Sequence, residues 1–492
     1  MNQWRRLVLA AFCAILLVLS FLKASMAPIT WDEAFTCIEF ISTGKLYPGA
    51  GGGMAANNHL LNTWLSYTFT RIFGINEINL RLGSILFFGV YLTATSWFAL
   101  RAKNFTVSFS VFALLSFNPY LFDFFCLSRG YGIAHACLLT SVVCIYRYNL
   151  SGEAKWLNRM LGAALAGMLA GAMLLPAFTL LYVTVFLLVP MVNDLRYGKL
   201  KWTTALRNSL KRTPLFIHMI FISALIVGVA YFILLQNFNA FLFGGKNGVM
   251  QDMLLSMIVN SAYHSGNSVL LYSLSATILA LILFLIIRIL KNIRLYSTSA
   301  EGKTAIVLLL TISGIIFSHG ILFILFSTPL PAERTALYLY ILAVSIISLT
   351  LMAEKRTSLF QNLAYVMTGF LMMIHFISSY NLKTFHDWRA DADAPLMIRD
   401  LSKVILSNKE KPYSSLSSLE LELPLKFYIE KNQELKNRIT IERINIPLNT
   451  ADIYFLEKNE SRISDSLEKE KNLIKITYPQ GGTLFYSSLI GK

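Results

Sequence analysis

Two adjacent carboxylates follow the first long apolar run of the chain, in the segment Thr30-Trp31-Asp32-Glu33-Ala34. Carboxylates at the mouth of a membrane helix are costly to keep partly desolvated, so acids retained there are candidates for function. A carboxylate beside an acceptor hydroxyl can take its proton as a general base or align it for attack. The alternative is that Asp32 and Glu33 are ordinary loop charges that lie in water.

Three further side chains beside apolar runs suggest phosphate chemistry. Arg129 lies in Ser128-Arg129-Gly130-Tyr131, and Arg334 and His59 stand near the starts of two other predicted helices. The guanidinium group of arginine binds phosphate with a planar fork of donors. Taken singly, an interfacial arginine can extend to the lipid headgroups, and Glu333 can neutralise Arg334. A phosphate site therefore requires a fold that brings these residues to one place.

The composition indicates an integral membrane protein. Of 492 residues, 55% are hydrophobic and 14% are charged, whereas soluble proteins have roughly 25% charged residues. The net charge of +16 resides in short loops between apolar runs, where the positive-inside rule places it, so we expect no nucleic-acid partner. Five cysteines without a CxxC pair are expected to be small core residues rather than disulfides or metal ligands.

About eleven segments are long and apolar enough to cross a bilayer, for which roughly 20 residues are needed. We predict spans at residues 7–24, 80–100, 105–122, 131–149, 160–176, 177–193, 214–235, 268–290, 304–327, 335–353 and 359–380. The run 160–193 is divided at Pro176, because proline cannot donate the helical hydrogen bond. The first run imitates a secretory signal, but its length favours a helix that is retained.

The distribution of lysine and arginine predicts the orientation of these spans. The basic loops alternate along the chain, which places the N-terminus in the cytoplasm and the C-terminal segment outside. All the polar candidates then share the outer face of the membrane: Asp32, Glu33, His59, Arg129, Glu333 and Arg334.

Two smaller parts complete the expected architecture, which is mainly α. Residues 60–73 have one apolar and one polar face, so we predict an amphipathic helix in the membrane interface. Residues 1–380 are expected to form the transmembrane domain and residues 381–492 a small external α/β domain. In the latter we predict helices starting at Asp393 and near 418–431 and 460–470, and strands at 439–446, 453–456, 473–477 and 483–489.

The order of the short motifs resembles that of membrane glycosyltransferases of the GT-C fold, near the protein O-mannosyltransferase and aminoarabinose transferase families. The matching segments are Trp31-Asp32-Glu33, Asn57-Asn58-His59-Leu60-Leu61, Phe73-Gly74, Arg81-Leu82, Ser128-Arg129-Gly130-Tyr131 and Glu333-Arg334-Thr335-Ala336-Leu337. They cover most of the first 150 residues and scattered points thereafter. Relatives often have His-Pro or Lys-Pro where this chain has His59-Leu60.

The resemblance implies inverting transfer of a sugar from a polyprenyl-phosphate donor to a hydroxyl acceptor at the outer face of the bacterial inner membrane. Asp32 would be the base and Glu33 its support, and Arg129, Arg334 and His59 would hold the donor phosphate. The substrate would be contacted by Trp31, Asn58, Tyr131, Glu333 and Trp388. The donor sugar and the acceptor (lipid, glycan or protein) stay open.

Two other functions remain in competition with transfer from a lipid-linked donor. A transporter or flippase of lipid-linked sugars would place its site near the middle of the membrane on broken helices. An enzyme resembling O-antigen ligase would rely on a long late external loop, whereas this chain has its acid pair in the first loop. A divalent cation bound by Asp32, Glu33 and His59 is also open, because these ligand types suit one but lack a diagnostic spacing.

Overall fold

The structure is a computed structural model of the whole chain. It describes residues 3–47, 58–171, 174–188, 211, 213–237, 244–263, 283, 287–289, 291, 296–353, 358–406, 412–444, 451–470 and 472–491. The chain divides into two compact units. The helical unit comprises Met1–Phe21, Gly53–Phe69 and Arg81–Tyr380. The mixed unit comprises Leu22–Gly52, Thr70–Leu80 and Asn381–Lys492.

Six helical segments of the described residues are long and apolar enough to cross a membrane. They are α1 (Gln3–Met26), α4 (Glu77–Ala99), α7 (Gly130–Ser151), α16 (Ala300–Phe326), the segment Glu333–Ala353 and α18 (Leu359–Ser379). The segment Glu333–Ala353 consists of the 3-10 helix η5 (Glu333–Ala336) and α17 (Tyr338–Ala353). A seventh span results if α5 (Phe105–Ser116) and α6 (Pro119–Phe125), bent by 60°, form one broken crossing. The bend occurs where the Asn118 side chain accepts the N–H of Leu121 and Pro119 starts a new helix.

These helices match seven of the predicted spans, and the count of about eleven is not confirmed. The run 160–193 is indeed two helices: α8 (Lys155–Ala170) and α9 (Leu175–Val183), which continues into the π-helix η3 (Thr184–Leu188). Pro176 lies in the first turn of α9, where its missing N–H costs nothing. Helix α12 (Leu215–Asn237) matches the predicted span 214–235, although its described apolar part, Leu215–Ala230, is shorter than a full span. The predicted span 268–290 lies almost wholly outside the described residues.

The amphipathic segment forms α3 (Leu60–Phe73), and its polar face is the buried one. Asn62, Ser66 and Thr70 are at most 5% exposed, whereas Trp64 is 51% and Ile72 65% exposed. A helix in water buries its apolar face, so this arrangement fits a helix whose apolar face contacts lipid. The polar face of α3 is then available to organise polar groups inside the protein.

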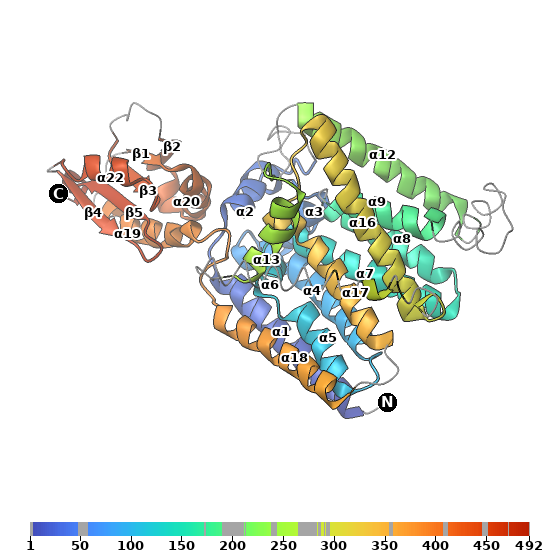
Figure 1. Cartoon of the computed structure of the whole chain (residues 1–492). Coiled ribbons are helices and arrows are strands. Elements are labelled where there is room, and N and C mark those ends of the chain that lie inside the picture. Colours follow the sequence, from blue (N-terminus) through green and yellow to red (C-terminus); the bar gives the residue numbers. More distant parts are fainter. Residues whose placement is uncertain are drawn as a thin grey trace. The chain divides into compact units, whose positions relative to one another are not determined.

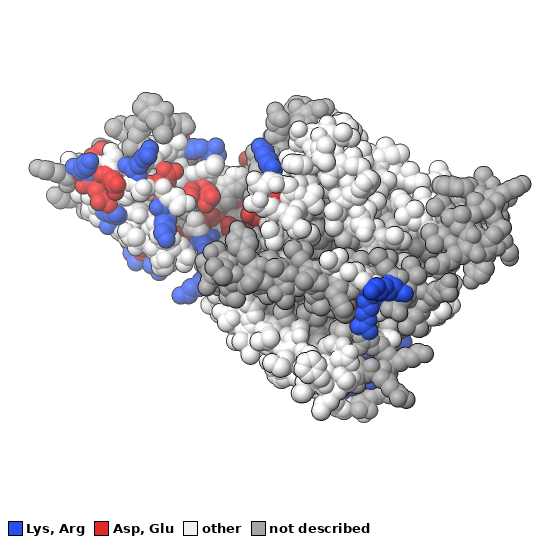
Figure 2. Space-filling view, in the orientation of Figure 1, with Lys and Arg blue, Asp and Glu red and all other residues white. Residues whose placement is uncertain are grey.

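Large apolar side chains cover the outward faces of the candidate spans. Phe360 of α18 is 80% exposed, and Ile324 of α16 is 77% exposed. Figure 1 shows these long helices, and Figure 2 shows that the described surface of the helical unit is largely uncharged. Such a surface is too apolar for water and suits lipid. All five cysteines are free, and four of them are buried, as expected for small core residues.

The mixed unit contains a five-stranded sheet with the strand order β2-β1-β3-β5-β4. The strands are β1 (Tyr413–Ser417), β2 (Ile439–Arg443), β3 (Ile453–Leu456), β4 (Leu473–Thr477) and β5 (Thr483–Ser487). Strand β1 pairs in parallel with β2 and β3, whereas β5 pairs antiparallel with both β3 and β4. The four predicted strands are confirmed as β2 to β5, and the sequence did not predict β1.

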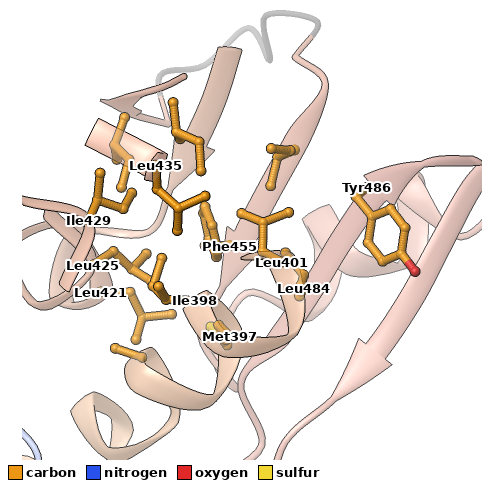
Figure 3. Packing of buried hydrophobic residues seen from close by; sticks show 14 of the residues in the cluster. Met397, Ile398, Leu401, Leu421, Leu425, Ile429, Leu435, Phe455, Leu484 and Tyr486 are labelled. Atoms are coloured by element: carbon orange, nitrogen blue, oxygen red, sulfur yellow. The ribbon is translucent and has the colours of Figure 1, made fainter. Parts of the chain in front are cut away.

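Two helices cover one face of this sheet and bring its apolar residues together (Figure 3). Helix α19 (Ala394–Leu406) buries Met397 and Leu401, and α20 (Leu419–Lys431) buries Leu421 and Leu425, each pair four residues apart. The remaining elements are η6 (Ala390–Asp393), α21 (Gln433–Lys436), α22 (Ser461–Leu467) and η7 (Ser488–Gly491). The predicted cap of α19, Asp393, instead accepts the main-chain N–H groups of Gln480 and Gly482.

Candidate functional site

The acid pair lies in a short helix that begins with a capping box. Helix α2 (Trp31–Thr36) starts after Thr30, whose hydroxyl accepts the N–H of Glu33 at 3.3 Å. In return the Glu33 carboxylate accepts the main-chain N–H of Thr30 at 3.0 Å and its hydroxyl at 3.2 Å. Two donors at the helix start are thereby satisfied within the segment. Glu33 holds α2 together, and a catalytic role for it stays a prediction.

Asp32 takes no part in this capping box. Its side chain is buried, and the residue is 4% exposed, while Glu33 is 1% exposed. Neither residue is a solvated loop charge, so the simpler interpretation of the pair does not hold. Helix α2 continues into the π-helix η1 (Cys37–Ile41), a distortion that is frequent at functional sites.

Two substitutions of Glu33 separate a role in capping α2 from a role in chemistry. Glu33→Gln keeps an amide oxygen that can accept from Thr30, so we expect α2 to stay formed and the activity of the protein to remain within about threefold of wild type. Glu33→Ala removes both hydrogen bonds and should destabilise α2 by about 1 kcal/mol, the usual cost of a lost cap. Hydrogen exchange of the α2 amides, measured beside activity, checks both. Equal loss of activity in the two variants would assign Glu33 a chemical role.

Other residues of the mixed unit surround the start of α2. The main-chain N–H of Trp31 donates to the Asp391 carboxylate at 2.6 Å, and its indole Nε1–H donates to the Leu419 carbonyl at 3.0 Å. The Trp31 ring stacks on Phe35 with centroids 5.6 Å apart. Trp388, predicted to contact substrate, is half-buried in the segment that precedes η6. The sequence did not single out Asp391, which is 360 positions from Trp31.

The helical unit brings His59, Arg129 and Arg334 together. The His59 and Tyr131 rings meet edge to face with centroids 5.2 Å apart, and the Arg129 Cζ atom lies 5.8 Å from the Tyr131 ring centroid. Both guanidinium groups act electrostatically on the His59 imidazole. Arg129 is 1% and His59 6% exposed, and Arg334 is half-buried. Three residues far apart in the sequence therefore form one cationic cluster, which we call the arginine cluster.

The imidazole in the arginine cluster is neutral at physiological pH. Burial lowers the pKa of His59 well below its ordinary value. The charge of Arg129 lowers that pKa further, as does the charge of Arg334, while the main chain of Ala170 opposes the shift. The positive charge of the cluster therefore comes from the two arginines, and His59 offers one donor and one acceptor nitrogen.

The polar face of α3 fixes the segment that carries Arg129. The Asn62 amide donates to the Ser128 carbonyl at 3.0 Å, and the Ser66 and Ser128 hydroxyls are 2.9 Å apart. Arg129 itself is the N-cap residue of α7 and has extended backbone angles. The polar face of α3 thus fixes Ser128, the residue that precedes Arg129 of the arginine cluster.

Gly130 is the position at which this packing leaves no room for a side chain. A Cβ atom there would lie 1.6 Å from the Ala170 carbonyl oxygen and 2.7 Å from the His59 Cβ atom. We expect Gly130→Ala to lower the thermal unfolding temperature and to displace His59 and Arg129 from each other. Gly162→Ala is the matched control, because a Cβ at that helical glycine meets nothing within 4 Å and should be neutral or mildly stabilising. An unchanged Gly130→Ala protein would contradict this packing.

Asn58 and Glu333, two other residues predicted to contact substrate, have different structural roles. The Asn58 side-chain oxygen accepts the Thr63 hydroxyl at 2.7 Å, so it helps to start α3. Glu333 has a φ of +50°, a conformation that is rare for residues other than glycine, and its N–H donates to the Ser256 hydroxyl at 2.8 Å. Ser256 starts α13 (Ser256–Ser261), which follows the π-helix η4 (Met250–Leu255). Unusual backbone held in place by its surroundings is common at ligand sites.

The acids Asp32 and Glu33 belong to the mixed unit, and His59 belongs to the helical unit. Among the residues that the structure describes, no group of three or more His, Cys, Asp or Glu side chains is arranged to hold a metal ion.

Among the comparisons with known proteins, the one with solved structures identifies the fold. No family model matches the chain, and no curated protein matches it. The crystal structure of ArnT from Cupriavidus metallidurans in the apo state is similar over 98% of both chains, with 10% identity and a TM-score of 0.54. The structure of the same protein bound to undecaprenyl phosphate is similar over 97% of both chains, with 12% identity and a TM-score of 0.53. The chain therefore has the GT-C fold of the aminoarabinose transferase ArnT, as its motifs predicted.

Proposed function

We propose that the protein is a membrane glycosyltransferase that moves a sugar from a polyprenyl-phosphate donor to a hydroxyl group. The observation that carries the proposal is the arginine cluster, which lies in a chain with the GT-C fold along its whole length. One ArnT structure with this fold is bound to undecaprenyl phosphate. The acceptor is a lipid, a glycan or a protein of the cell envelope.

The charge of the cluster suits the leaving group of this reaction. When the bond between the anomeric carbon and the phosphate oxygen breaks, a phosphodiester with one negative charge becomes a phosphomonoester that carries about −1.5 to −2. Arg129 and Arg334 supply two positive charges where this extra charge develops, and Arg129 is shielded from water. Because His59 is neutral, it packs beside the two guanidinium groups without adding to their positive charge.

We assign the activation of the acceptor hydroxyl to a base in the first loop. The acceptor hydroxyl oxygen forms a bond to the anomeric carbon, its proton passes to the Asp32 carboxylate, and polyprenyl phosphate leaves. Attack opposite to the leaving group inverts the anomeric centre. Asp32 is buried, and surroundings of low dielectric constant strengthen the interaction of its carboxylate with an acceptor proton. Glu33 serves this step by holding α2.

A transporter is less well supported by the position of the cationic groups. Transporter sites lie near the middle of the membrane on interrupted helices. Arg129 instead precedes the first residue of α7, and Arg334 lies in the first turn of the segment Glu333–Ala353. Both arginines thus stand at the ends of span-length helices, where a phosphate headgroup would be found.

The proposal is tested by comparing the envelopes of cells with and without the protein. Mass spectrometry of extracted lipids and glycans is expected to show one species that loses a single sugar residue when the gene is deleted. Restoration by the wild-type protein but not by Asp32→Asn would tie the product to this site. An unchanged envelope glycome and lipidome would count against the proposal.

A further inference from the structure

The start of α2 and the residue before its N-cap donate three hydrogen bonds to the C-terminal part of the mixed unit. The N–H of Trp31 donates to Asp391 at 2.6 Å, the Trp31 indole donates to the Leu419 carbonyl at 3.0 Å, and the N–H of Ile29 donates to the Tyr428 hydroxyl at 2.9 Å. The acceptors come from η6 and from both ends of α20. These contacts join the segment 29–31 to residues nearly 400 positions away in the sequence.

Helix α2 depends on such contacts for its position. It has six residues, and isolated helices shorter than about 12–15 residues are marginal in water. Its capping box fixes the helix internally but does not fix where the helix points. The N–H groups of a first turn have no partner inside the helix, and Asp391 supplies one for Trp31. Asp32 is the next residue, so the main chain that carries its carboxyl is anchored one residue away.

We propose that Asp391 is a positioning residue that acts through Trp31 to set the place of the Asp32 carboxyl, and that α20 assists it through Leu419 and Tyr428. This inference rests on the proposed function, because it gives the C-terminal part of the chain a task in the same reaction. It assigns to Asp391 a role in the rate of the chemical step and none in donor binding.

The surroundings of Asp391 fit an anchor rather than a solvated charge. The residue is 3% exposed. Burial raises the pKa of the Asp391 carboxyl well above its usual range, and the charges of Glu420, Asp32 and Glu457 raise it further, against the hydrogen bond from Trp31. Either protonation state retains an oxygen that accepts the Trp31 N–H, so the anchor holds across the physiological pH range.

Steady-state kinetics of the full-length protein with a polyprenyl-phosphate sugar test this role. Asp391→Ala removes the acceptor, and we expect kcat to fall about 10- to 100-fold, the order of loss caused by a displacement of about 1 Å, while KM for the donor stays within about twofold. Asp391→Asn keeps an amide oxygen for Trp31 and should retain at least a third of the wild-type kcat. The matched control is Asp465→Ala, at an exposed aspartate of α22, which should leave both constants unchanged.

Three outcomes of these measurements would contradict a positioning role for Asp391. Wild-type kcat in Asp391→Ala, a raised KM with normal kcat, or equal losses in Asp391→Asn and Asp391→Ala would overturn it. If Asp391→Ala does not fold, Tyr428→Phe decides, since it removes the acceptor of the Ile29 N–H and keeps the ring. A lower kcat with unchanged KM then supports the inference, and a normal kcat overturns it.

The same assay separates this inference from the proposed function. An inactive Asp32→Asn beside a fully active Asp391→Ala would remove only the positioning role. A fully active Asp32→Asn would remove the proposed base, whatever Asp391→Ala does.

Discussion

Asp32→Asn is expected to lower the rate of sugar transfer by about 10²- to 10⁴-fold, the contribution typical of a positioned general base. Asparagine has the size of aspartate and keeps one oxygen, but it cannot take a proton from the acceptor. Donor binding should remain within about twofold of wild type, because the phosphate is assigned to Arg129 and Arg334. The rate is measured by single turnover with saturating donor, and binding is measured separately with polyprenyl phosphate.

The neighbouring acid provides the control for this variant. Glu33→Gln removes one negative charge from the same short helix and from the adjacent position. If both variants lose activity equally, the effect reflects the helix as a whole rather than a base at Asp32. Full turnover by a folded Asp32→Asn protein would exclude the assigned chemistry.

Arg129→Gln is expected to weaken binding of polyprenyl phosphate by at least about 30-fold. Removing one partner of a buried charge pair costs about 2–5 kcal/mol, and each 1.4 kcal/mol is a factor of about ten in Kd. Arg129 is 1% exposed, so water cannot replace its guanidinium group. The half-buried Arg334 should show a smaller loss in Arg334→Gln, because solvent compensates part of it.

Lys383→Gln is the control for a general charge effect. Lys383 is exposed in the segment after α18, and its loss changes the net charge of the protein by the same amount. We expect binding within about twofold of wild type for this variant. Equal weakening by Lys383→Gln and Arg129→Gln would mean that the donor responds to overall charge and not to the arginine cluster.

Seven of the long apolar helices and four of the five strands could be predicted because hydropathy and alternation encode them locally. Strand β1 escaped prediction because Tyr413-Ser-Ser-Leu-Ser has no alternation of apolar and polar residues. It is a strand because β2 and β3 flank it in parallel register, a condition that only the folded chain supplies. Helix α3 was predicted correctly, but its periodicity could not tell that Asn62 and Ser66 would face the protein.

Some parts of the candidate site could be predicted from the alternation of basic loops or from the spacing of neighbouring residues, and others could not. The distribution of basic residues placed His59, Arg129 and Arg334 in one layer, and these three lie together in the helical unit. The capping role of Glu33 was encoded by the spacing of Thr30 and Glu33, but the sequence interpretation favoured catalysis for both acids. The sequence placed the charged linker that ends at Asp391 beside the site, but it did not single out Asp391, because no local pattern links this residue to Trp31 across 360 positions.

The most direct measurement follows the release of polyprenyl phosphate from a lipid-linked sugar by the purified protein in proteoliposomes, with envelope extract as the source of acceptor. A panel of donors with different sugars identifies the one that is used. We expect release that requires the extract, yields an equal amount of glycosylated product, and falls at least about 100-fold in Asp32→Asn. No release from any donor, or equal release by wild type and Asp32→Asn, would contradict a transferase with its base at Asp32.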